Sequence, residues 1–383
     1  RNLISIYLKL IDFREKWLKE LSEGKNIEPI HLVFVEEPEA HLHAQAQQVF
    51  VKKAFEALCN NKLIEENPWL STQLVLSTHS NHVVNELDLN CMRYFKRVID
   101  VGEKIPVSKV VNLSSTFGTD DETKQFVTRY IRLTHCDIFF SDAVVLVEGP
   151  AEKILVPSFL VKAGLDSYYI SVIEVNGRHA HSFRKLIEKI GIAALIVTDI
   201  DATDTKVGED GKEIHPSVIT AKGNGYKTGN PSIKSWLSGK EQIDDLLALD
   251  EKEKLVNNVR IAFQTPVNVK WDKNKDDLTE VCPYTFEDAL IFTNLELFRR
   301  EGLKKMGAIT TIANLLKHSN SANELQNKIF KKLESKSGFQ KADFAISLLY
   351  KDDFVDLVAP VYIQEGLEWM KSYLDSNGNR NGE

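Results

Sequence analysis

The sequence is poor in cysteine and lacks any long apolar run. Its four cysteines, at positions 59, 91, 136 and 282, form no C-x-x-C pair, so neither a zinc site nor a disulfide framework is indicated. No apolar stretch approaches the roughly 18 residues of a membrane-spanning helix, and the first residues do not form a signal-like segment. These absences predict a cytoplasmic protein without a membrane partner.

An excess of basic residues is also absent. The 383 residues carry a formal net charge of −7, which argues against nucleic-acid binding by the surface as a whole and leaves a local basic patch as the remaining route. With 43% hydrophobic and 27% charged residues, the composition is that of a soluble globular protein. The length suggests two or three domains.

Two short apolar runs, each followed by acids, are the most informative segments that are present. Residues 143–152 read AVVLVEGPAE and residues 194–201 read ALIVTDID. Both runs are β-branched and too short to be long helices, so we expect buried strands of a parallel sheet in an α/β fold. Glu148 ends the first run, and the Gly-Pro that follows suits a tight turn into a helix that carries Glu152.

Asp199 and Asp201 end the second run and can both face the crevice beyond the carboxyl ends of the sheet. Together with Glu148 and Glu152 they would make this crevice strongly negative unless cations filled it. Carboxylate oxygens suit one or two hard divalent ions, Mg²⁺ or Mn²⁺. The alternative is an ordinary strand end whose acids are solvated.

The order of these acids resembles the Toprim domain, which topoisomerases, primases and a group of nucleases share. The resemblance lies in Glu-Gly-x-x-Glu at 148–152 followed by Asp-x-Asp at 199–201. A helix of about 15 residues, a strand over residues 168–175 and a helix over residues 181–190 fit the interval between the two motifs. The resemblance implies a Rossmann-like parallel sheet.

The amino-terminal part has a different signature. Residues 31–43 read HLVFVEEPEAHLH and residues 71–80 read STQLVLSTHS, and both begin as predicted strands. They resemble the second half of an ABC-type ATPase domain, in which Glu36 matches the Walker B acid, Glu37 the acid that polarises water, and His79 the switch histidine. The family usually has Asp where this chain has Glu36.

No G-x-x-x-x-G-K-[ST] loop occurs in the chain, so the loop that cradles phosphates is missing. Residues 3–21 have apolar positions at helical spacing and resemble the helix that follows an ABC signature sequence. We therefore expect the chain to begin inside an ATPase domain whose Walker A half lies upstream. ATP would be a cofactor of the full-length protein, and this chain alone should bind ATP poorly or not at all.

An ABC-type ATPase half that runs into a Toprim domain is similar to the OLD (overcoming lysogenization defect) family of nucleases. The resemblance implies a DNA endonuclease with a two-metal Toprim centre, governed by an ATPase that also makes a homodimer or higher homo-oligomer. Within this family the Gabija-type nucleases of anti-phage defence are close in arrangement. That likeness implies a helicase partner.

The family resemblance also assigns roles to residues. It gives one metal ion to Glu148, Asp199 and Asp201, which would be catalytic, and a second ion to Glu152 with Glu287. Glu287 lies in the first turn of a helix expected over residues 285–302 with a Thr cap. Acids are common at helix starts for dipole reasons alone, and that remains the alternative for Glu287.

Lys341 lies in KADFAISLL and resembles a family lysine near the scissile phosphate, with a solvated lysine as the alternative. Residues 221–240 are the best DNA-contact candidate. They contain Lys222, Lys227, Lys234 and Lys240 and no acidic residue. Trp236 lies within this segment. The alternative is a flexible solvated loop in which Trp236 anchors the following helix.

The predicted organisation is an ATPase part over residues 1–98, a connector or dimerisation region over 99–137, a Toprim nuclease domain with helical additions over 138–375, and a disordered tail over 376–383. Two other functions stay open. A topoisomerase or primase would also need a tyrosine nucleophile domain or a zinc module, and neither is visible. A noncatalytic ATP-gated DNA-binding or scaffold protein would carry degenerate acids, whereas Glu148, Asp199 and Asp201 are intact.

Overall fold

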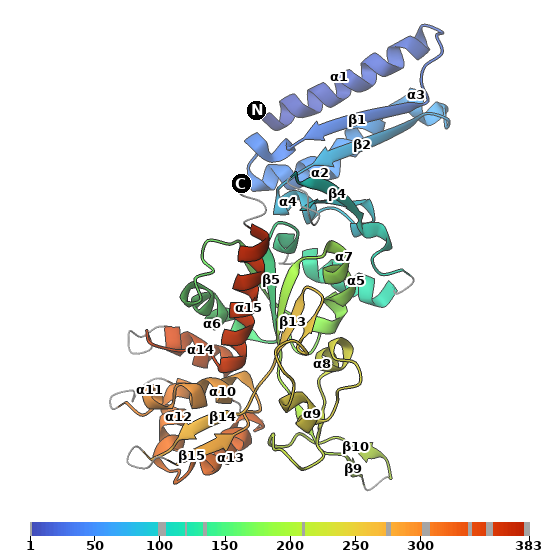
Figure 1. The fold of residues 1–383 in the computed structure, drawn as a ribbon. Helices are drawn as coiled ribbons and strands as arrows, with labels where there is room; N and C mark the ends of the chain where they lie inside the picture. The colour runs from blue at the N-terminus through green and yellow to red at the C-terminus, as the bar shows by residue number, and fades with distance from the viewer. Residues whose placement is uncertain are drawn as a thin grey trace. The chain divides into compact units, whose positions relative to one another are not determined.

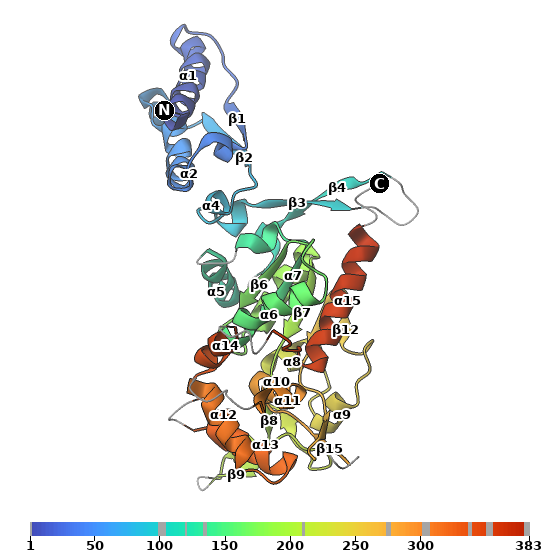
Figure 2. The same cartoon turned by 90° about the vertical axis from the view of Figure 1, so that its left-hand side faces the viewer.

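The computed structural model describes residues 2–98, 105–118, 121–132, 136–208, 211–272, 277–300, 307–335, 339–349 and 355–378. The chain forms two compact units, whose elements are labelled in Figures 1 and 2. Unit 1 comprises Arg1–Phe95 and Val110–Phe140, and unit 2 comprises Lys96–Lys109 and Ser141–Glu383. Residues 110–137 of the predicted connector thus group with the ATPase part, and its residues 99–109 group with the Toprim part.

Unit 1 is built on two parallel strands, β1 (Ile30–Glu36) and β2 (Ser71–Ser77), which pair in register from Ile30 opposite Ser71 to Glu36 opposite Ser77. Both strands and the predicted first helix, α1 (Asn2–Ser22), are confirmed. The alternating strand pattern turns Val33 toward α1 and α2 (Ala44–Cys59), where it packs with Leu10 and Phe50. The other elements of the unit are η1 (Pro38–His41), α3 (Lys62–Glu66), α4 (Asn81–Val84), η2 (Leu89–Cys91), η3 (Leu113–Ser115), α5 (Asp121–Tyr130) and η5 (Cys136–Phe139).

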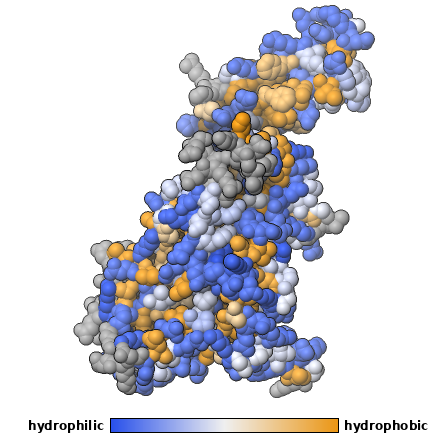
Figure 3. All heavy atoms as spheres, in the orientation of Figure 1, coloured by the Kyte–Doolittle hydropathy of each residue, from blue (hydrophilic) through white to orange (hydrophobic). Residues whose placement is uncertain are grey.

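The opposite face of the β1–β2 pair exposes apolar side chains. Leu32 and Phe34 on β1 and Val75 on β2 are all solvent-exposed, with Phe34 at 67% of its surface. Figure 3 shows hydrophobic residues gathered over this unit among hydrophilic ones. Where the division between the units falls, the chain makes a hairpin of β3 (Arg93–Val98) and β4 (Val107–Asn112).

Unit 2 contains a five-stranded sheet in the order β12-β13-β7-β5-β6. Neighbouring strands are parallel except at the edge pair β12–β13, and the two strands between the edges of this parallel core, β5 and β7, are fully buried. This arrangement confirms the predicted Rossmann-like parallel sheet. The strands are β5 (Ala143–Val147), β6 (Ile170–Glu174), β7 (Ala193–Val197), β12 (Leu255–Val256) and β13 (Val259–Ala262).

Helices cover the sheet as the sequence predicts for a βαβ chain. After β5 comes α6 (Pro150–Lys162), which begins with a proline in its first turn, and before β7 come η6 (Ala180–Phe183) and α7 (Arg184–Ile190). The last helix, α15 (Val361–Gly378), packs on β7 through Gly366, whose missing side chain leaves room for Leu195. Because α15 includes Ser376 to Gly378, the predicted tail begins too early, and residues 379–383 lie outside the described residues.

Helices α10 to α14, the helical group, follow β13 in the chain and carry two predicted site residues, Glu287 and Lys341. The helix expected over 285–302 is wrong in extent, since α10 (Phe286–Thr293) ends before Asn294 and a separate short helix, α11 (Leu295–Phe298), follows; residues 301–302 lie outside the described residues. The predicted Thr cap is present as a capping box, in which the Thr285 side chain accepts from the backbone of Asp288 and the Asp288 side chain accepts from the Thr285 N–H. The remaining helices are α8 (Pro231–Trp236), α9 (Ile243–Leu247), α12 (Gly307–Lys317), α13 (Ala322–Leu333) and α14 (Lys341–Leu349).

Small antiparallel pairs complete unit 2. They are β8 (Ala202–Thr203) with β11 (Lys227–Thr228), β9 (Lys206–Val207) with β10 (Glu213–Ile214), and β14 (Val267–Lys270) with β15 (Leu278–Val281). None of the helices in the described ranges is both long enough and apolar enough to span a membrane.

Candidate metal centre

The site begins where β5 and β7 end side by side. These strands pair in parallel with Val147 opposite Val197, so the residues that follow, Glu148 and Thr198, emerge at the same edge of the sheet. The Thr198 hydroxyl donates a hydrogen bond to Glu148 Oε1. Asp199 comes next in the chain, which places it at the edge that Glu148 occupies.

Asn230 links the acids of the two strand ends. It follows β11 in the turn Thr-Gly-Asn-Pro, and its side chain is completely buried. Its Nδ2 lies 2.8 Å from Glu148 Oε1, 2.8 Å from the Asp199 carbonyl oxygen and 3.2 Å from Asp201 Oδ2. A single amide therefore fixes the positions of both strand ends.

Asp199 is held by donors from two other elements. Gln264, just after β13, donates from Nε2 to Asp199 Oδ1 at 2.6 Å, and the Phe286 backbone N–H at the start of α10 donates to the same oxygen at 3.0 Å. Gln264 is itself oriented by the Ile200 N–H, which donates to Gln264 Oε1 at 2.7 Å. The Asp199 carboxylate is thus held in place by donors from the end of β13 and from the start of α10.

Glu152 and Glu287 are buried carboxylates with unsatisfied oxygens. Glu152, in the first turn of α6, is 3% exposed, and Glu287, in the first turn of α10, is 0% exposed. Within the described part of the chain, Glu152 Oε2 and Glu287 Oε1 have no hydrogen-bond donor, and Glu287 Oε2 has only the ammonium of Lys341. Gly149 leaves room for this arrangement, because a Cβ there would lie 3.2 Å from Glu152 Oε2. Buried unpaired carboxylate oxygens are costly and call for a cation or a proton.

Lys341 supplies one cation at this edge. Its Nζ lies 3.0 Å from Glu287 Oε2 and 4.0 Å from Asp199 Oδ2. Burial by itself would lower the pKa of Lys341, but the carboxylates of Glu287 and Asp199 raise it above its usual value. The predicted lysine is therefore within the acid cluster, charged, at the first residue of α14.

Asp201 has an unusual backbone and its own cationic partner. Its φ of 49° lies in the left-handed region, which is costly for a residue other than glycine and is typical of functional sites. Arg178 Nε lies 2.9 Å from Asp201 Oδ2. The Asp201 carboxylate therefore contacts the loop that follows β6.

Burial and mutual repulsion shift the acids toward their protonated forms. Burial raises the pKa of Glu152 to about 8, and the Glu287 carboxylate adds to this rise. Burial and Glu148 raise the pKa of Asp201 to about 6, although Arg178 opposes the shift. Burial also raises the pKa of Asp199 well above its usual range, against the effect of Lys341. Carboxylates in this state gain most from a cation that replaces the protons.

The residues fit a hard divalent cation in their chemistry. The acidic side chains at this edge offer only oxygen atoms as metal ligands, and they outnumber the neighbouring cations Lys341 and Arg178. Glu152 and Glu287 each keep a carboxylate oxygen without a hydrogen-bond donor. As placed, no three His, Cys, Asp or Glu side chains of the described residues are close enough to hold an ion together. Binding would therefore require the acids to exchange some protein donors for the ion.

The predicted ATPase residues lie at the ends of β1 and β2. Glu36 is the last residue of β1, and Glu37 follows with a φ of 41°. His79 Nε2 lies 3.7 Å from Glu37 Oε1, and both side chains are exposed. Glu39 joins the two loops, because its Oε1 accepts hydrogen bonds from the Thr78 hydroxyl and the His79 N–H, each at 2.7 Å. The structure thus brings Glu37 and His79 together.

Comparison with known protein families supports both parts of this description. Residues 139–201 match the family described as "Overcoming lysogenization defect protein-like, TOPRIM domain", and residues 1–84 match the family described as "AAA ATPase domain". The first match runs from just before β5 to Asp201 and so includes Glu148, Glu152 and Asp199. The chain carries an OLD-like Toprim domain. Its amino-terminal part is an AAA ATPase segment.

Two curated relatives are nucleases by name. The chain is 29% identical over 388 residues to Endonuclease GajA of Bacillus cereus (strain HuB5-5), across 98% of this chain and 53% of that protein. It is 25% identical over 189 residues to Endonuclease GajA of Bacillus cereus (strain VD045), across 49% of this chain and 29% of that protein. This chain therefore spans about half the length of the first relative.

A solved structure, the C-terminal region of the Burkholderia pseudomallei OLD protein, is similar at a TM-score of 0.35 and 18% identity, covering 61% of this chain and 99% of that one. A score of that size bears no weight on the fold. The fold assignment therefore depends on the parallel sheet and the Toprim match.

The predicted DNA-contact lysines lie on the Toprim side and are exposed. Lys222 forms an ion pair with Glu280 at 2.8 Å, Lys227 lies in β11, and Lys234 lies in α8. Trp236 is 3% exposed and packs under the Arg184 guanidinium, whose Cζ lies 4.7 Å from the ring centroid. Trp236 therefore anchors α8, as the alternative interpretation expected, and offers no face for stacking on a base.

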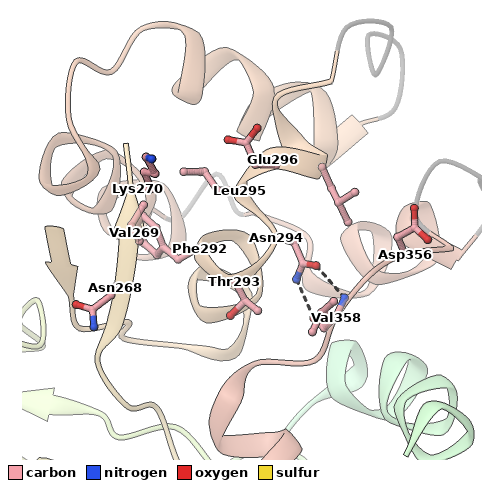
Figure 4. Close-up of a pocket in the computed structure, with 11 residues that line it drawn as sticks. Asn268, Val269, Lys270, Phe292, Thr293, Asn294, Leu295, Glu296, Asp356 and Val358 are labelled. Atoms are coloured by element: carbon pink, nitrogen blue, oxygen red, sulfur yellow. Dashed lines mark hydrogen bonds between the residues drawn. The ribbon is translucent and has the colours of Figure 1, made fainter. Parts of the chain in front are cut away.

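A pocket of about 510 Å³ lies beside β14, α10 and α11 (Figure 4). It is lined by residues of β14, the end of α10 and α11, together with Asp356 and Val358. Asn294 closes one wall, because its amide donates to the Val358 carbonyl and its oxygen accepts from the Val358 N–H. None of the predicted catalytic or metal-binding residues lines it.

Four residues at the two sites escaped prediction from the sequence. Asn230 lies in the Thr-Gly-Asn-Pro turn, which was the one available signal for it. Gln264 lies two residues after the end of β13, Arg178 follows a Gly in a loop, and Glu39 follows a Pro. These last three positions have no motif of their own, and only the packing of separate elements reveals their contacts.

Proposed function

We propose that the Toprim domain is a metal-dependent DNA endonuclease that hydrolyses phosphodiester bonds under control of the AAA ATPase segment. The observation that carries this proposal is the pair of buried carboxylates with unsatisfied oxygens, Glu152 and Glu287, beside the strand-end acids. An inactive scaffold domain would have no reason to keep such a costly cluster. The names of the curated relatives agree with this activity.

The acids divide into two groups by position. Glu148, Asp199 and Asp201 share the Asn230 amide and would hold one Mg²⁺ or Mn²⁺, whereas Glu152 and Glu287 would hold a second. When bound, such ions lower the pKa of a water for in-line attack and stabilise the leaving oxygen. Asn230 and Gln264 orient the carboxylates, and these hydrogen bonds are among the donors that the acids would exchange for the ion.

Lys341 would act on the substrate side of the cluster. Its ammonium is charged and 38% exposed, so it can turn from Glu287 toward a phosphate that enters the edge. Negative charge grows on the phosphate oxygens during hydrolysis, and a fixed cation stabilises that charge. Lys341 therefore takes the role of a catalytic residue, with Glu148, Asp199 and Asp201.

The exposed lysines and the ATPase residues complete the proposal. Lys222, Lys227 and Lys234 would contact DNA phosphates, with Lys222 leaving Glu280 to do so. Glu36, Glu37 and His79 would contact ATP in the full-length protein, where the facing Glu37 and His79 would orient water and the γ-phosphate. A homodimer or higher homo-oligomer, a helicase partner and a role in anti-phage defence belong to the same proposal.

Cleavage of supercoiled plasmid in Mg²⁺, Mn²⁺ or EDTA tests the proposal. Asp199→Asn and Glu148→Gln keep the shape of the side chains but remove their charge, and each should reduce cleavage at least about a hundredfold. Asp166→Asn is the matched control, because Asp166 is an exposed acid beyond the far end of α6. It should cut as the wild-type chain does.

Two outcomes separate the candidate functions. Cleavage that persists in both active-site variants would remove the proposed centre. A folded wild-type chain that retains DNA in EDTA and cuts with neither metal would favour the scaffold function, and religation of cut plasmid would favour a topoisomerase.

A further inference from the structure

The loop after β6 brings a basic side chain to the edge of the sheet that carries Glu148, Asp199 and Asp201, called the acid edge below. Asn176 and Gly177 both have positive φ, at 49° and 93°, which turns the chain sharply at this point. The Gly177 N–H donates to the Glu148 carbonyl oxygen at 2.7 Å. The loop is therefore tied to the end of β5, and its next residue, Arg178, is placed beside the acids.

Arg178 is held by one side of its guanidinium. Nε lies 2.9 Å from Asp201 Oδ2, Nη2 lies 3.3 Å from Asp201 Oδ1, and Nη1 reaches the Gly229 carbonyl oxygen only at 3.5 Å. The backbone is fixed as well, since the Ser232 hydroxyl and His181 Nδ1 both contact the Arg178 carbonyl oxygen. The Asp201 carboxylate thus orients the guanidinium, and the contacts to the carbonyl oxygen fix the backbone that carries it.

The remaining side of the guanidinium is open to solvent. The Arg178 side chain is 46% exposed, whereas its Asp201 partner is 8% exposed. A guanidinium has five N–H donors in a planar fork, and the pair with Asp201 uses only part of them. The free donors match the paired oxygens of a phosphate, which an ammonium cannot engage in the same way.

Taken together, these contacts lead us to infer that Arg178 binds a backbone phosphate of the DNA strand at the acid edge and positions that strand against Asp201. This inference rests on the proposed nuclease function and names a substrate contact for it. Lys341 lies with Asp199 and Glu287, and Arg178 lies with Asp201. The two cations therefore neutralise different acids. A DNA strand, which the acids would otherwise repel, would gain one phosphate contact from each cation.

Equilibrium DNA binding tests this without cleavage. A duplex is titrated in Ca²⁺, which replaces Mg²⁺ as a hard oxygen-binding cation, over a range of salt concentrations. Arg178→Ala should weaken binding about tenfold and reduce the slope of log K against log salt by about one phosphate contact. Arg178→Lys keeps the charge, so it should restore the slope but not the full affinity.

Arg300→Ala is the matched control. Arg300 is 49% exposed and lies 3.6 Å from Asp356, so it resembles Arg178 in exposure and in its acidic partner but lies outside the Toprim edge. It should leave the affinity and the salt slope unchanged. In Mg²⁺ cleavage, Arg178→Ala should raise KM more than it lowers kcat, because a positioning contact acts on binding.

The outcomes distinguish this inference from the function on which it rests. If the wild-type chain cuts DNA but Arg178→Ala binds with the wild-type affinity and salt slope, Arg178 only neutralises Asp201 and the inference is overturned. If the wild-type chain neither binds nor cuts DNA, the nuclease proposal fails and the inference fails with it.

Discussion

The Lys341 ammonium lies 3.0 Å from Glu287 Oε2, a carboxylate oxygen of a side chain with no exposed surface. Lys341 begins α14 and Glu287 lies in the first turn of α10, so this ion pair connects two helix N-termini. The pair keeps a buried negative charge compensated in the absence of metal. If Glu287 holds an ion as proposed, Lys341 and that ion would compete for the same carboxylate.

Removing the lysine alone should therefore destabilise the metal-free chain. In Lys341→Met, Glu287 loses its counter-charge, and we expect a loss of about 2 kcal/mol in the free energy of unfolding. This figure is below the usual value for a broken buried pair because Lys341 is 38% exposed and solvent screens it. Urea unfolding in EDTA measures the change.

The double variant Lys341→Met/Glu287→Gln is the control for that measurement. It removes both charges, so most of the loss should be recovered through a favourable coupling between the two sites. Equal destabilisation in the single and the double variant would mean that Lys341 contributes through packing and not through Glu287.

Glu152 should make the metal-free chain less stable as pH rises. Its pKa is about 8 in the folded chain against the ordinary value of 4.5, so between these pH values the folded state holds more protons than the unfolded state. The free energy of unfolding then falls with increasing pH across this window. Glu152→Gln cannot ionise, so the fall should be smaller in this variant.

Urea unfolding in EDTA at roughly pH 5 and pH 8 measures this slope. Asp166→Asn, which alters an exposed acid, should keep the wild-type slope. An unchanged slope in Glu152→Gln would show that Glu152 is already ionised at the lower pH, and the buried carboxylate would then have found another partner.

The acids at the strand ends could be predicted because a parallel sheet has only one carboxyl edge. Glu148 and Asp199 follow apolar runs in the sequence, and the pairing of β5 with β7 brings them together. Glu152 follows Glu148 by one helical turn, so its place also depends on local geometry. These relations need no knowledge of distant packing.

The donors that hold those acids could not be predicted in the same way. Gln264 and the Phe286 N–H reach Asp199 across 65 and 87 residues, and nothing in their local sequence marks them as partners. The same holds at the end of α10, where the side chain of its C-cap, Asn294, pairs with the Val358 backbone 64 residues away. Such contacts depend on how separate elements pack.

Gly366 should be required for the packing of α15 on the Toprim sheet. A Cβ at this position would lie 2.6 Å from Leu195 Cδ1 on β7, which is too close for any real contact. Gly366→Ala gains about 1 kcal/mol of helix propensity but loses about 2 kcal/mol or more through overpacking. We therefore expect a net loss of about 1 kcal/mol in urea unfolding with an unchanged m-value.

Gly366→Ala is measured again in a chain that carries Leu195→Ala. In that background the added methyl group has space, so Gly366→Ala should be neutral or stabilising. If Gly366→Ala stabilises the wild-type chain, α15 can move away from β7 without cost, and the close approach is not needed for the fold.

Asn230→Asp tests whether one more carboxylate beside Glu148 and Asp201 lowers the free energy of unfolding in the absence of metal. The substitution keeps the shape of the side chain but replaces the amide that lies 2.8 Å from Glu148 Oε1 and 3.2 Å from Asp201 Oδ2 with another carboxylate. Loss of the donor and added repulsion should cost about 3 kcal/mol or more in EDTA.

Asn230→Ala separates the two contributions, because it removes the donor without adding charge. The difference between the Asp and Ala variants therefore reports repulsion, and Mg²⁺ should reduce that difference, since the metal stabilises the folded state by mass action. If Asn230→Asp is as stable as Asn230→Ala in EDTA, the acids are protonated and do not repel. Mg²⁺ binding would then have to displace protons, and the stabilisation by Mg²⁺ should grow with pH.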